Sequence, residues 1–379
     1  MSGQLVAKAP RHLVVMAAGT GGHVIPGLAV AREVIARGWT VSWLGTRTGM
    51  ERALVERAGL PFDALAFSGI RGKGRWAWLT GGPRLLRAIA ASVRILHRSA
   101  PQVVFTTGGY VAVPGGLAAA CLRRPLLFLN ADAAPQLSLR LLLRFVRVVL
   151  CGFDGAAARL AGPKACVSGA PVREDIAALA EPALRFAARR GPLALLVVGG
   201  SLGARVLNET VPAALALLAP AQRPAVVHQC GAGNEAATRA AYERAGVAAE
   251  VLAFIDDIGA RYAAADLVLC RAGAITVTEL CAAGLGAILV PFVARTTAHQ
   301  RDNAEFLAAR GAALHLPQAS FTPQALAQQL GALDRARLTE MARCARALAR
   351  PGATAQVVRQ IEALVPAAAP MPAQSGART

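Results

Sequence analysis

The sequence predicts an α/β protein with two domains, each built around a doubly wound parallel β-sheet. Short apolar runs alternate with helix-sized segments along the whole chain, and four turns rich in glycine or alanine each join such a run to a helix. Strands that alternate with helices form parallel sheets from right-handed βαβ units. The 379 residues are enough for two domains with separate cores.

The apolar runs locate the individual strands. In the first half of the chain they predict strands at 12–17, 40–44, 103–106, 126–129 and 146–151. In the second half they predict strands at 193–198, 225–229, 267–270 and 287–290. We place the domain boundary near residue 170, followed by a helix at 177–190, so that the domains span 1–170 and 171–365. The tail 366–379, rich in Ala, Pro, Ser and Gly, is expected to be disordered.

Composition narrows the classes of partner and compartment. A formal net charge of +19 points to nucleic acid, an anionic membrane surface or an anionic small molecule. Nucleic acid ranks last, because aromatic residues are 5% of the chain and no nucleic-acid-binding motif occurs. Seven scattered cysteines without a Cys-x-x-Cys pair argue against a zinc site and a disulfide framework. Residues 1–10 lack the apolar segment of a secretory signal, so a cytosolic location is expected.

The four turns that follow predicted strands favour phosphate or sugar binding. They lie at 19–22, at 108–109 with 115–116, at 199–203 and at 272–274. Such turns expose backbone N–H groups at helix N-termini, which attract anions, and parallel strands bring their carboxyl ends to one edge of a sheet. The alternative is ordinary strand-to-helix turn chemistry, which explains one such cluster more easily than four.

Several nucleotide sites are excluded by spacing. Val24 occupies the third glycine position of a dinucleotide fingerprint, and the second strand ends at Thr46 without an acid. The chain has neither a Gly-x-x-x-x-Gly-Lys-Ser/Thr sequence nor an Asp-x-Asp sequence, so a P-loop and the usual metal–diphosphate clamp are absent. A diphosphate would have to be neutralised by helix N-termini and cations, and no metal or other cofactor is called for.

The second half carries three candidate binding segments. Backbone amides after Gly199 and the Ser201 hydroxyl are suited to hold a diphosphate. Glu279 lies about one and a half turns into a helix that begins near Ala274, where a carboxylate can accept two ribose hydroxyls. The alternative is that Glu279 caps its own helix or pairs with a surface arginine. The polar segment 297–303, which contains Gln300, is placed to bind sugar hydroxyls.

Several motifs in order resemble the MurG family. They are Gly19-Thr20-Gly21-Gly22-His23, Ser68-Gly69-Ile70-Arg71-Gly72-Lys73-Gly74, Gly108-Gly109-Tyr110-Val111 with Pro114-Gly115-Gly116, and the segment 274–279. The similarity runs from about residue 11 to residue 361. It implies a GT-B fold with an interdomain cleft, and transfer of GlcNAc from UDP-GlcNAc to lipid I, which makes lipid II for peptidoglycan and so serves cell shape and division.

The resemblance also implies a division of labour between the domains. The N-terminal domain would bind the acceptor and the membrane, and the C-terminal domain would bind UDP-GlcNAc, with the last helix able to pack back on the first domain. The enzyme would be peripheral, at the cytoplasmic face of the bacterial inner membrane.

The matching positions assign individual contacts. Those facing the donor sugar and the lipid I diphosphate are Thr20, Gly21 and Gly22. Those holding the UDP phosphates are Arg173, Ser201, Ala274, Ile275, Thr276, Val277 and Thr278. The Ile255 backbone would meet uracil, Glu279 would bind ribose, and Gln300 would bind the GlcNAc hydroxyls.

Two departures from the family pattern keep alternatives open. Leu202 replaces the glutamine of Gly-Gly-Ser-Gln-Gly-Ala, and Leu129-Asn130-Ala131-Asp132 replaces His-Glu-Gln-Asn. Asp132 thus stands where the family has a donor-contacting asparagine. The alternatives are a related GT-B transferase that acts on another membrane lipid, and a UDP-sugar-binding paralogue with weak or no catalysis.

The implied reaction is an inverting displacement, in which the acceptor C4 hydroxyl attacks the anomeric carbon and UDP leaves. It needs a general base and stabilisation of the leaving diphosphate. His23 is the candidate base, because its ordinary pKa is near neutrality and it lies at the first glycine turn. Alternatively, His23 only hydrogen-bonds the turn or a phosphate. Asp132 is a weaker candidate for the base.

Cations interleaved with apolar residues predict membrane contact by the first domain. Segment 70–79 contains Trp76 and Trp78, residues suited to the membrane interface. A following helix would place its arginines opposite an apolar face; these are Arg84, Arg87, Arg94 and Arg98 against Leu86, Ile89, Ala90, Val93 and Leu96. A second basic cluster comprises Arg140, Arg144 and Arg147. The alternative is a solvated helix face over an ordinary core.

Overall fold

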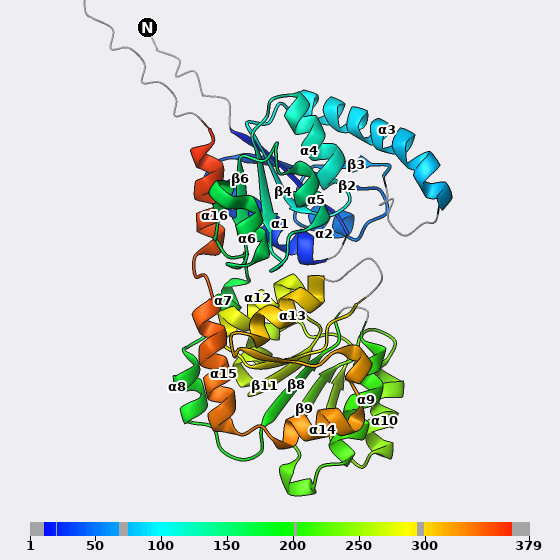
Figure 1. Ribbon diagram of the computed structural model, residues 1–379, viewed down its shortest axis with the longest axis vertical. Coiled ribbons are helices and arrows are strands. Elements are labelled where there is room, and N and C mark those ends of the chain that lie inside the picture. Colours follow the sequence, from blue (N-terminus) through cyan, green and yellow to red (C-terminus); the bar gives the residue numbers. More distant parts are fainter. Residues whose placement is uncertain (1–10, 20, 68–74, 201–202, 294–298, 366–379) are drawn as a thin grey trace, which may run out of the picture.

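The computed structural model describes residues 11–19, 21–67, 75–200, 203–293 and 299–365, with the backbone alone for 75–80. It contains two α/β domains, each with a parallel sheet between helices (Figure 1). The predicted fold class is confirmed. All nine predicted strands are present, with ends within two residues of the expected positions.

The N-terminal domain holds a seven-stranded parallel sheet of order β3-β2-β1-β4-β5-β6-β7. Its strands are β1 (His12–Ala17), β2 (Thr40–Thr46), β3 (Phe62–Leu65), β4 (Val103–Gly108), β5 (Leu126–Asn130), β6 (Val148–Cys151) and β7 (Ala165–Cys166). Its helices are α1 (Gly21–Ala36), α2 (Glu51–Arg57), α3 (Arg75–Ser99), α4 (Ala112–Cys121), α5 (Leu137–Leu142), α6 (Ala156–Ala161) and the 3₁₀ turn η1 (Gly162–Lys164).

The C-terminal domain holds a six-stranded parallel sheet of order β10-β9-β8-β11-β12-β13. Its strands are β8 (Ala194–Val198), β9 (Ala225–Gln229), β10 (Glu250–Leu252), β11 (Leu267–Cys270), β12 (Ala287–Leu289) and β13 (Ala313–His315). The helices up to the last strand are α7 (Glu174–Ala177), α8 (Pro182–Ala187), α9 (Arg205–Ala216), α10 (Glu235–Arg244), α11 (Ile258–Ala264), α12 (Ala274–Ala283) and α13 (His299–Ala308), with η2 (Pro220–Gln222). After β13 come η3 (Gln318–Ser320), α14 (Pro323–Gly331), α15 (Arg335–Leu348) and α16 (Ala353–Ala363).

The strand order places all four glycine- or alanine-rich turns at equivalent points. In each sheet the order reverses between two central strands, β1 and β4 in the first and β8 and β11 in the second. Leu13 of β1 pairs with Val103 of β4, and Leu195 of β8 pairs with Leu267 of β11. The four turns directly follow these four strands. Ligands of doubly wound sheets bind where the order reverses, at the carboxyl ends of the strands.

The last helix returns to the N-terminal domain (Figure 1). Helix α15 packs on the C-terminal domain, whereas the buried side of α16 joins the core beneath α1 and β2. Val357, Val358 and Ile361 of α16 lie in one cluster with Trp43. Arg37 of α1 forms an ion pair with Glu362 at 3.0 Å. The chain therefore passes between the two domains twice, and the two connections lie close together, since a Cβ at Gly169 would come within 2.5 Å of Arg350 Cβ.

The helix predicted at 177–190 is wrong. The segment forms two short helices, α7 and α8, separated by extended backbone. Pro182 begins α8, and Glu181 before it has ψ 142°. A proline disfavours helical backbone at the preceding residue and lacks the N–H that a continuous helix needs.

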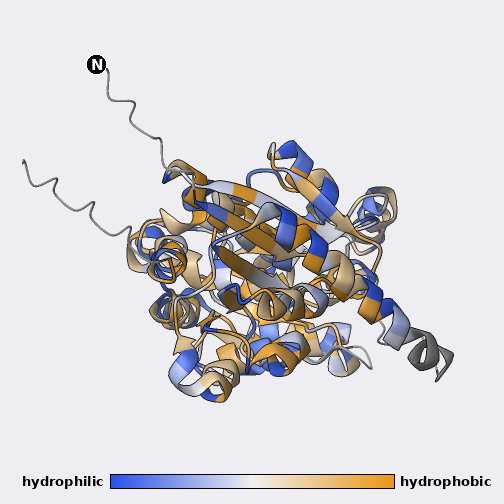
Figure 2. Ribbon diagram, turned by 90° about the horizontal axis from the view of Figure 1, so that it is seen from above, coloured by the Kyte–Doolittle hydropathy of each residue, from blue (hydrophilic) through white to orange (hydrophobic). Residues whose placement is uncertain are grey.

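Helix α3 follows the predicted basic face but not the whole predicted apolar face. Its four arginines 84, 87, 94 and 98 are exposed, as expected. The buried row is Ala88, Ser92 and Leu96, which follow a spacing of four residues, so Leu86 and Ala90 lie on the exposed side. Residues 70–74 and the side chains of Trp76 and Trp78 lie outside the described part. Seen from above, the apolar strands lie between helices of mixed hydropathy (Figure 2). No helix in the described ranges is long and apolar enough to span a membrane.

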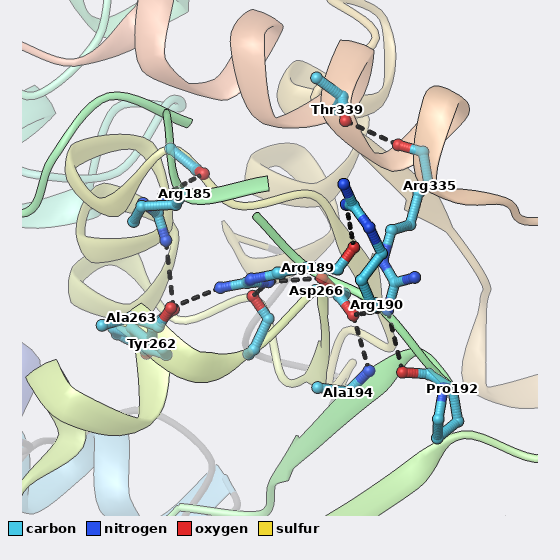
Figure 3. A network of polar contacts seen from close by, with 12 residues as sticks. Arg185, Arg189, Arg190, Pro192, Ala194, Tyr262, Ala263, Asp266, Arg335 and Thr339 are labelled. Carbon is cyan, nitrogen blue, oxygen red and sulfur yellow. Dashed lines mark hydrogen bonds and ion pairs between the residues drawn. The ribbon is translucent and has the colours of Figure 1, made fainter. Parts of the chain in front are cut away.

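Part of the cationic excess serves the fold. Asp266, buried just before β11, accepts hydrogen bonds from Ala194 N at 2.8 Å, Arg189 Nη1 at 2.5 Å and Arg335 Nη2 at 3.4 Å (Figure 3). A buried carboxylate is tolerated when its oxygens are paired in this way. The network joins the amino ends of β8 and β11, at the opposite end of these strands from the glycine turns.

Candidate functional site

The first glycine turn opens helix α1 beside the turn after β4. Gly21, Gly22 and His23 form the first turn of α1, whose N–H groups have no partner within the helix. Gly109 has φ +81°, and a Cβ there would come within 2.0 Å of Ala18 O. Only glycine allows the two turns to approach this closely. Thr20 lies outside the described residues.

Glu51 holds this turn in place, a role that the sequence analysis missed. Its fully buried carboxylate accepts hydrogen bonds from Thr46 N at 2.7 Å and from Gly19 N at 3.3 Å. Dinucleotide-binding folds place a ribose-binding acid at the end of the second strand. Here the acid is Glu51, five residues after the end of β2. Its carboxylate accepts hydrogen bonds from backbone N–H groups of the protein itself.

His23 is held in one tautomer by the turn after β4. Its Nδ1 lies 2.9 Å from Thr107 O, and Thr107 Oγ1 donates to His23 O at 2.8 Å. Because a carbonyl oxygen only accepts, Nδ1 carries the hydrogen, and Nε2 of the neutral ring keeps its lone pair. Burial lowers the pKa of His23 below 6.5, although Asp132 and the Thr107 carbonyl act in the opposite direction. The ring is therefore neutral at pH 7 and able to accept a proton.

Asp132 lies in the loop after β5, at the contact between the domains. Its carboxylate is buried; Oδ1 accepts a hydrogen bond from Asn303 Nδ2 of α13 at 2.9 Å, and Oδ2 lies 3.4 Å from Gln136 Nε2. The structure thus brings Asp132 near His23 but engages it with protein partners. Asn303 is a second residue to which the sequence analysis assigned no role of its own.

Glu279 lies where the helix-start prediction placed it, on the second turn of α12. Its side chain is 6% exposed, and Arg173, just before α7, approaches Oε1 with its Nε at 3.3 Å. Burial raises the pKa of Glu279 to about 7, with Arg173 opposing and Asp175 adding to the rise. Among the described residues Glu279 Oε1 has no hydrogen-bond partner. A buried carboxylate oxygen without a donor is suited to a ligand hydroxyl.

Helix α12 is suited to bind an anion at its N-terminus. Gly273 precedes it and supplies no side-chain cap, so the N–H groups of Ala274, Ile275 and Thr276 have no partner within the helix. Val277 and Thr278 complete the first turns. At the other end, Arg185 Nη2 donates to Gly284 O at 2.8 Å, and Arg346 Nη1 donates to Ala282 O. Cations at the C-terminus and open amides at the N-terminus both match the helix dipole.

Two further donor-side loops are tied together by Gln229, another residue that the sequence analysis missed. Its Oε1 accepts from Gly200 N at 2.9 Å, and its Nε2 donates to Gly200 O and to Ala253 O, each at 2.9 Å. Gly200 belongs to the turn that contains Ser201, which lies outside the described residues together with Leu202. Ile255 follows Ala253 in the β10–α11 connection, and its backbone N–H and C=O bond no described residue.

Gln300 lies in the first turn of α13. Its Oε1 accepts the N–H of Phe292 at 2.9 Å, which fixes the amide against the segment after β12. The structure therefore places Arg173 beside Glu279 of α12, with Ile255 and Gln300 in the same domain. Gly21, Gly22 and His23 lie in the other domain.

Comparisons with known proteins agree with this architecture. Residues 13–151 match the glycosyltransferase family 28 N-terminal domain, and residues 194–357 match the family 28 C-terminal domain. A relative from Methylibium petroleiphilum is 58% identical over 94% of this chain and 98% of its own length. One from Chromobacterium violaceum is 55% identical over 92% of this chain and 97% of its own length. Both are named UDP-N-acetylglucosamine--N-acetylmuramyl-(pentapeptide) pyrophosphoryl-undecaprenol N-acetylglucosamine transferase.

Solved structures share the fold. The crystal structure of Acinetobacter baumannii MurG superposes with a TM-score of 0.80 at 39% identity, covering 93% of this chain and 100% of that chain. The calicheamicin glycosyltransferase CalG4 superposes with a TM-score of 0.67 at 18% identity, over 96% of this chain and 100% of that chain, which is a likeness of fold alone. With high identity over nearly its whole length and both family domains present, the chain belongs to the MurG family within glycosyltransferase family 28.

Proposed function

We propose that this chain transfers N-acetylglucosamine from UDP-GlcNAc to the C4 hydroxyl of lipid I, forming lipid II with inversion and without a metal ion. It is a UDP-GlcNAc-dependent glycosyltransferase of peptidoglycan synthesis. One observation carries the donor assignment: the buried Glu279 Oε1, which is ion-paired with Arg173 but has no hydrogen-bond partner among the described residues, lies one turn beyond the open amides that begin α12. This pairing of an acceptor with anion-binding donors matches a ribose joined to a diphosphate.

The described residues support a single displacement. His23 Nε2 takes the proton of the acceptor hydroxyl as its oxygen bonds to the anomeric carbon. The bond from that carbon to the UDP oxygen breaks, and UDP leaves with the electron pair. The open amides of Ala274–Thr276 and the Arg173 guanidinium would stabilise the charge that develops on the diphosphate. Gln300 would orient the GlcNAc hydroxyls, and Gly21 and Gly22 would face the sugar and the lipid I diphosphate.

A UDP-release assay tests this function. UDP-GlcNAc is supplied in EDTA with and without a lipid I analogue, and we expect release of UDP only when the analogue is present. Diacylglycerol serves as the alternative lipid acceptor. Release with diacylglycerol alone would assign the enzyme to another membrane lipid, and UDP-GlcNAc binding without release would make it a sugar-nucleotide-binding paralogue.

We further propose that the N-terminal domain attaches the enzyme to the cytoplasmic face of the bacterial inner membrane. Helices α3 and α5 both pack against α4, so the two basic clusters lie on the same face of the sheet. Leu86, Leu137 and Leu141 are exposed there. A hollow of about 590 Å³ is lined by Arg140, Leu141, Arg144 and Lys164, among others. Exposed leucines among cations fit an anionic lipid surface.

Removing two of these charges should weaken membrane binding. Each juxtaposed cation contributes about 1 kcal/mol at an anionic leaflet, so the double variant Arg140→Gln/Arg144→Gln should bind phosphatidylglycerol-containing vesicles about 30-fold less tightly. The matched control, Arg239→Gln/Arg244→Gln, removes two exposed charges from α10 of the other domain. Vesicle sedimentation measures both. An equal loss in the two double variants would show that total charge, rather than this face, drives attachment.

A further inference from the structure

Asn303 bridges the two domains with a side-chain amide whose N–H donors and oxygen are all engaged. It is fully buried on α13. Its Oδ1 accepts the N–H of Ala133 at 2.8 Å, and its Nδ2 donates to Asp132 Oδ1 at 2.9 Å and to Ala272 O at 3.0 Å. Ala133 and Asp132 belong to the N-terminal domain, whereas Ala272 belongs to the turn before α12. One side chain thus fixes α13 to both domains.

An aromatic contact one turn further along α13 strengthens the same docking. The ring of Phe306 lies 5.1 Å from that of Phe153, in the connection between β6 and α6. Phe153 is buried in the core cluster of the C-terminal domain, although β6, the strand that precedes it, belongs to the first sheet. Asn303 and Phe306 are three residues apart and share a helix face. This face of α13 therefore contacts the N-terminal domain through a polar and an apolar pair.

Hydrogen bonds of Asn130 hold the loop on the receiving side, which reaches the surroundings of His23. Asn130 donates to Asp132 O at 2.7 Å and to Ala134 O at 3.1 Å, and accepts from Gln136 N at 2.9 Å. Gln136 in turn lies against Gly108, since a Cβ there would meet its Oε1 at 2.1 Å and His23 Cε1 at 3.2 Å. The residue that receives Asn303 is therefore linked by short contacts to the proposed base.

We propose that the Asp132–Asn303 contact sets the spacing between the donor sugar and His23, with Asp132 acting as a positioning residue of the N-terminal domain. Gln300, assigned above to the GlcNAc hydroxyls, lies less than one turn before Asn303 on the same helix. Docking of α13 onto the loop after β5 thereby places the sugar relative to the base. Asp132 Oδ1 is already bonded, so this carboxylate acts on the reaction through α13. The inference rests on the proposed function.

Substitutions at 132 should separate turnover from donor affinity. Loss of a hydrogen bond to a charged group corresponds to about a 10- to 100-fold effect. We expect Asp132→Ala to lower kcat by about this factor and to leave the Kd for UDP within about twofold, because the UDP-contacting residues all lie in the other domain. Asp132→Asn keeps an oxygen acceptor for Asn303 Nδ2 and should recover much of kcat. Glu305→Gln removes an exposed carboxylate from the same helix and serves as control.

A double-mutant cycle and hydrogen–deuterium exchange complete the test. Asp132→Ala/Asn303→Ala should lose no more kcat than the more impaired of the two single variants, because Asp132 acts through Asn303. Exchange in α13 should rise in each single variant, while exchange in β8 and β9 stays unchanged. This readout needs no turnover, so it tests the contact even if lipid I proves not to be the acceptor. Additive losses, unchanged α13 exchange, or a Kd for UDP that rises as far as kcat falls would overturn the proposal.

Discussion

Replacing His23 with alanine should lower kcat by about 10²- to 10⁴-fold, the usual contribution of a general base. The Thr107 carbonyl holds the proton on Nδ1, so Nε2 carries the lone pair that accepts the acceptor's proton. Affinity for UDP should stay within about twofold, because the base and the nucleotide residues lie in different domains. Steady-state rates with the lipid I analogue and calorimetry with UDP measure the two quantities.

The variant His23→Asn distinguishes a general base from a residue that only hydrogen-bonds the turn after β4. Its side-chain amide can donate to Thr107 O as Nδ1 does, but it has no basic nitrogen. If His23 is the base, His23→Asn should be as slow as His23→Ala. Near-normal turnover of His23→Asn would show that only the hydrogen bond to the turn matters. His97→Ala, which removes an exposed histidine from α3, controls for effects of histidine loss elsewhere.

Replacing Glu279 with glutamine should weaken donor binding and stabilise the free protein above neutral pH. A carboxylate that accepts ribose hydroxyls contributes about 1.5–3 kcal/mol per charged hydrogen bond, so the Kd for UDP-GlcNAc should rise by at least about tenfold at pH 8. In the parent, the pKa of about 7 means that the accepting carboxylate forms as pH rises. Donor affinity should therefore increase about tenfold from pH 6 to pH 8 in the parent and stay flat in Glu279→Gln.

Deprotonation of Glu279 has opposite effects on donor affinity and on the stability of the free protein: it strengthens donor binding and weakens folding. Because the folded-state pKa of Glu279 is raised from 4.5 to about 7, folding favours the protonated form. Its stabilising contribution is complete below pH 4.5 and is lost as pH rises through 7, at a cost of up to about 3 kcal/mol. Glu279→Gln should thus unfold at a higher temperature than the parent at pH 8 and lose that advantage by pH 4.5. An increase in unfolding temperature that is equal at pH 8 and pH 4.5 would contradict this account. So would the same increase in Glu209→Gln, which changes an exposed residue.

The strands that the sequence did not predict are the four edges of the two sheets. The central strands read as continuous apolar runs because both of their faces are covered by helices. The edge strands β3, β7, β10 and β13 have two to four residues and include Asp63, Glu250 and His315. A short strand with one open side needs no apolar run, and its pairing comes from the neighbouring strand. The local sequence pattern therefore predicted the inner strands of each sheet but not its edge strands.

The same division applies to the site. Glycine turns after strands, the helix beginning near Ala274 and the position of Glu279 on it are local features, and the structure reproduces them. No sequence spacing marks Glu51, Gln229 and Asn303. Glu51 bonds groups 5 and 32 residues away in the chain, Gln229 bonds groups 24 and 29 residues away, and Asn303 bonds groups 31 to 171 residues away. The only local signal for Glu51 is that it is the first acidic residue after Thr46.

The sequence by itself determined the fold class, the central strands, the four turns and the family, because each depends on residues close together in the chain or on motifs in a fixed order. The tertiary structure alone decided that all four turns lie at the two strand-order reversals, that Asp132 faces Asn303, and that Glu279 is buried beside Arg173 with a raised pKa. Those features depend on which strands pair and on how the domains dock. Burial, partner and protonation are properties of that packing.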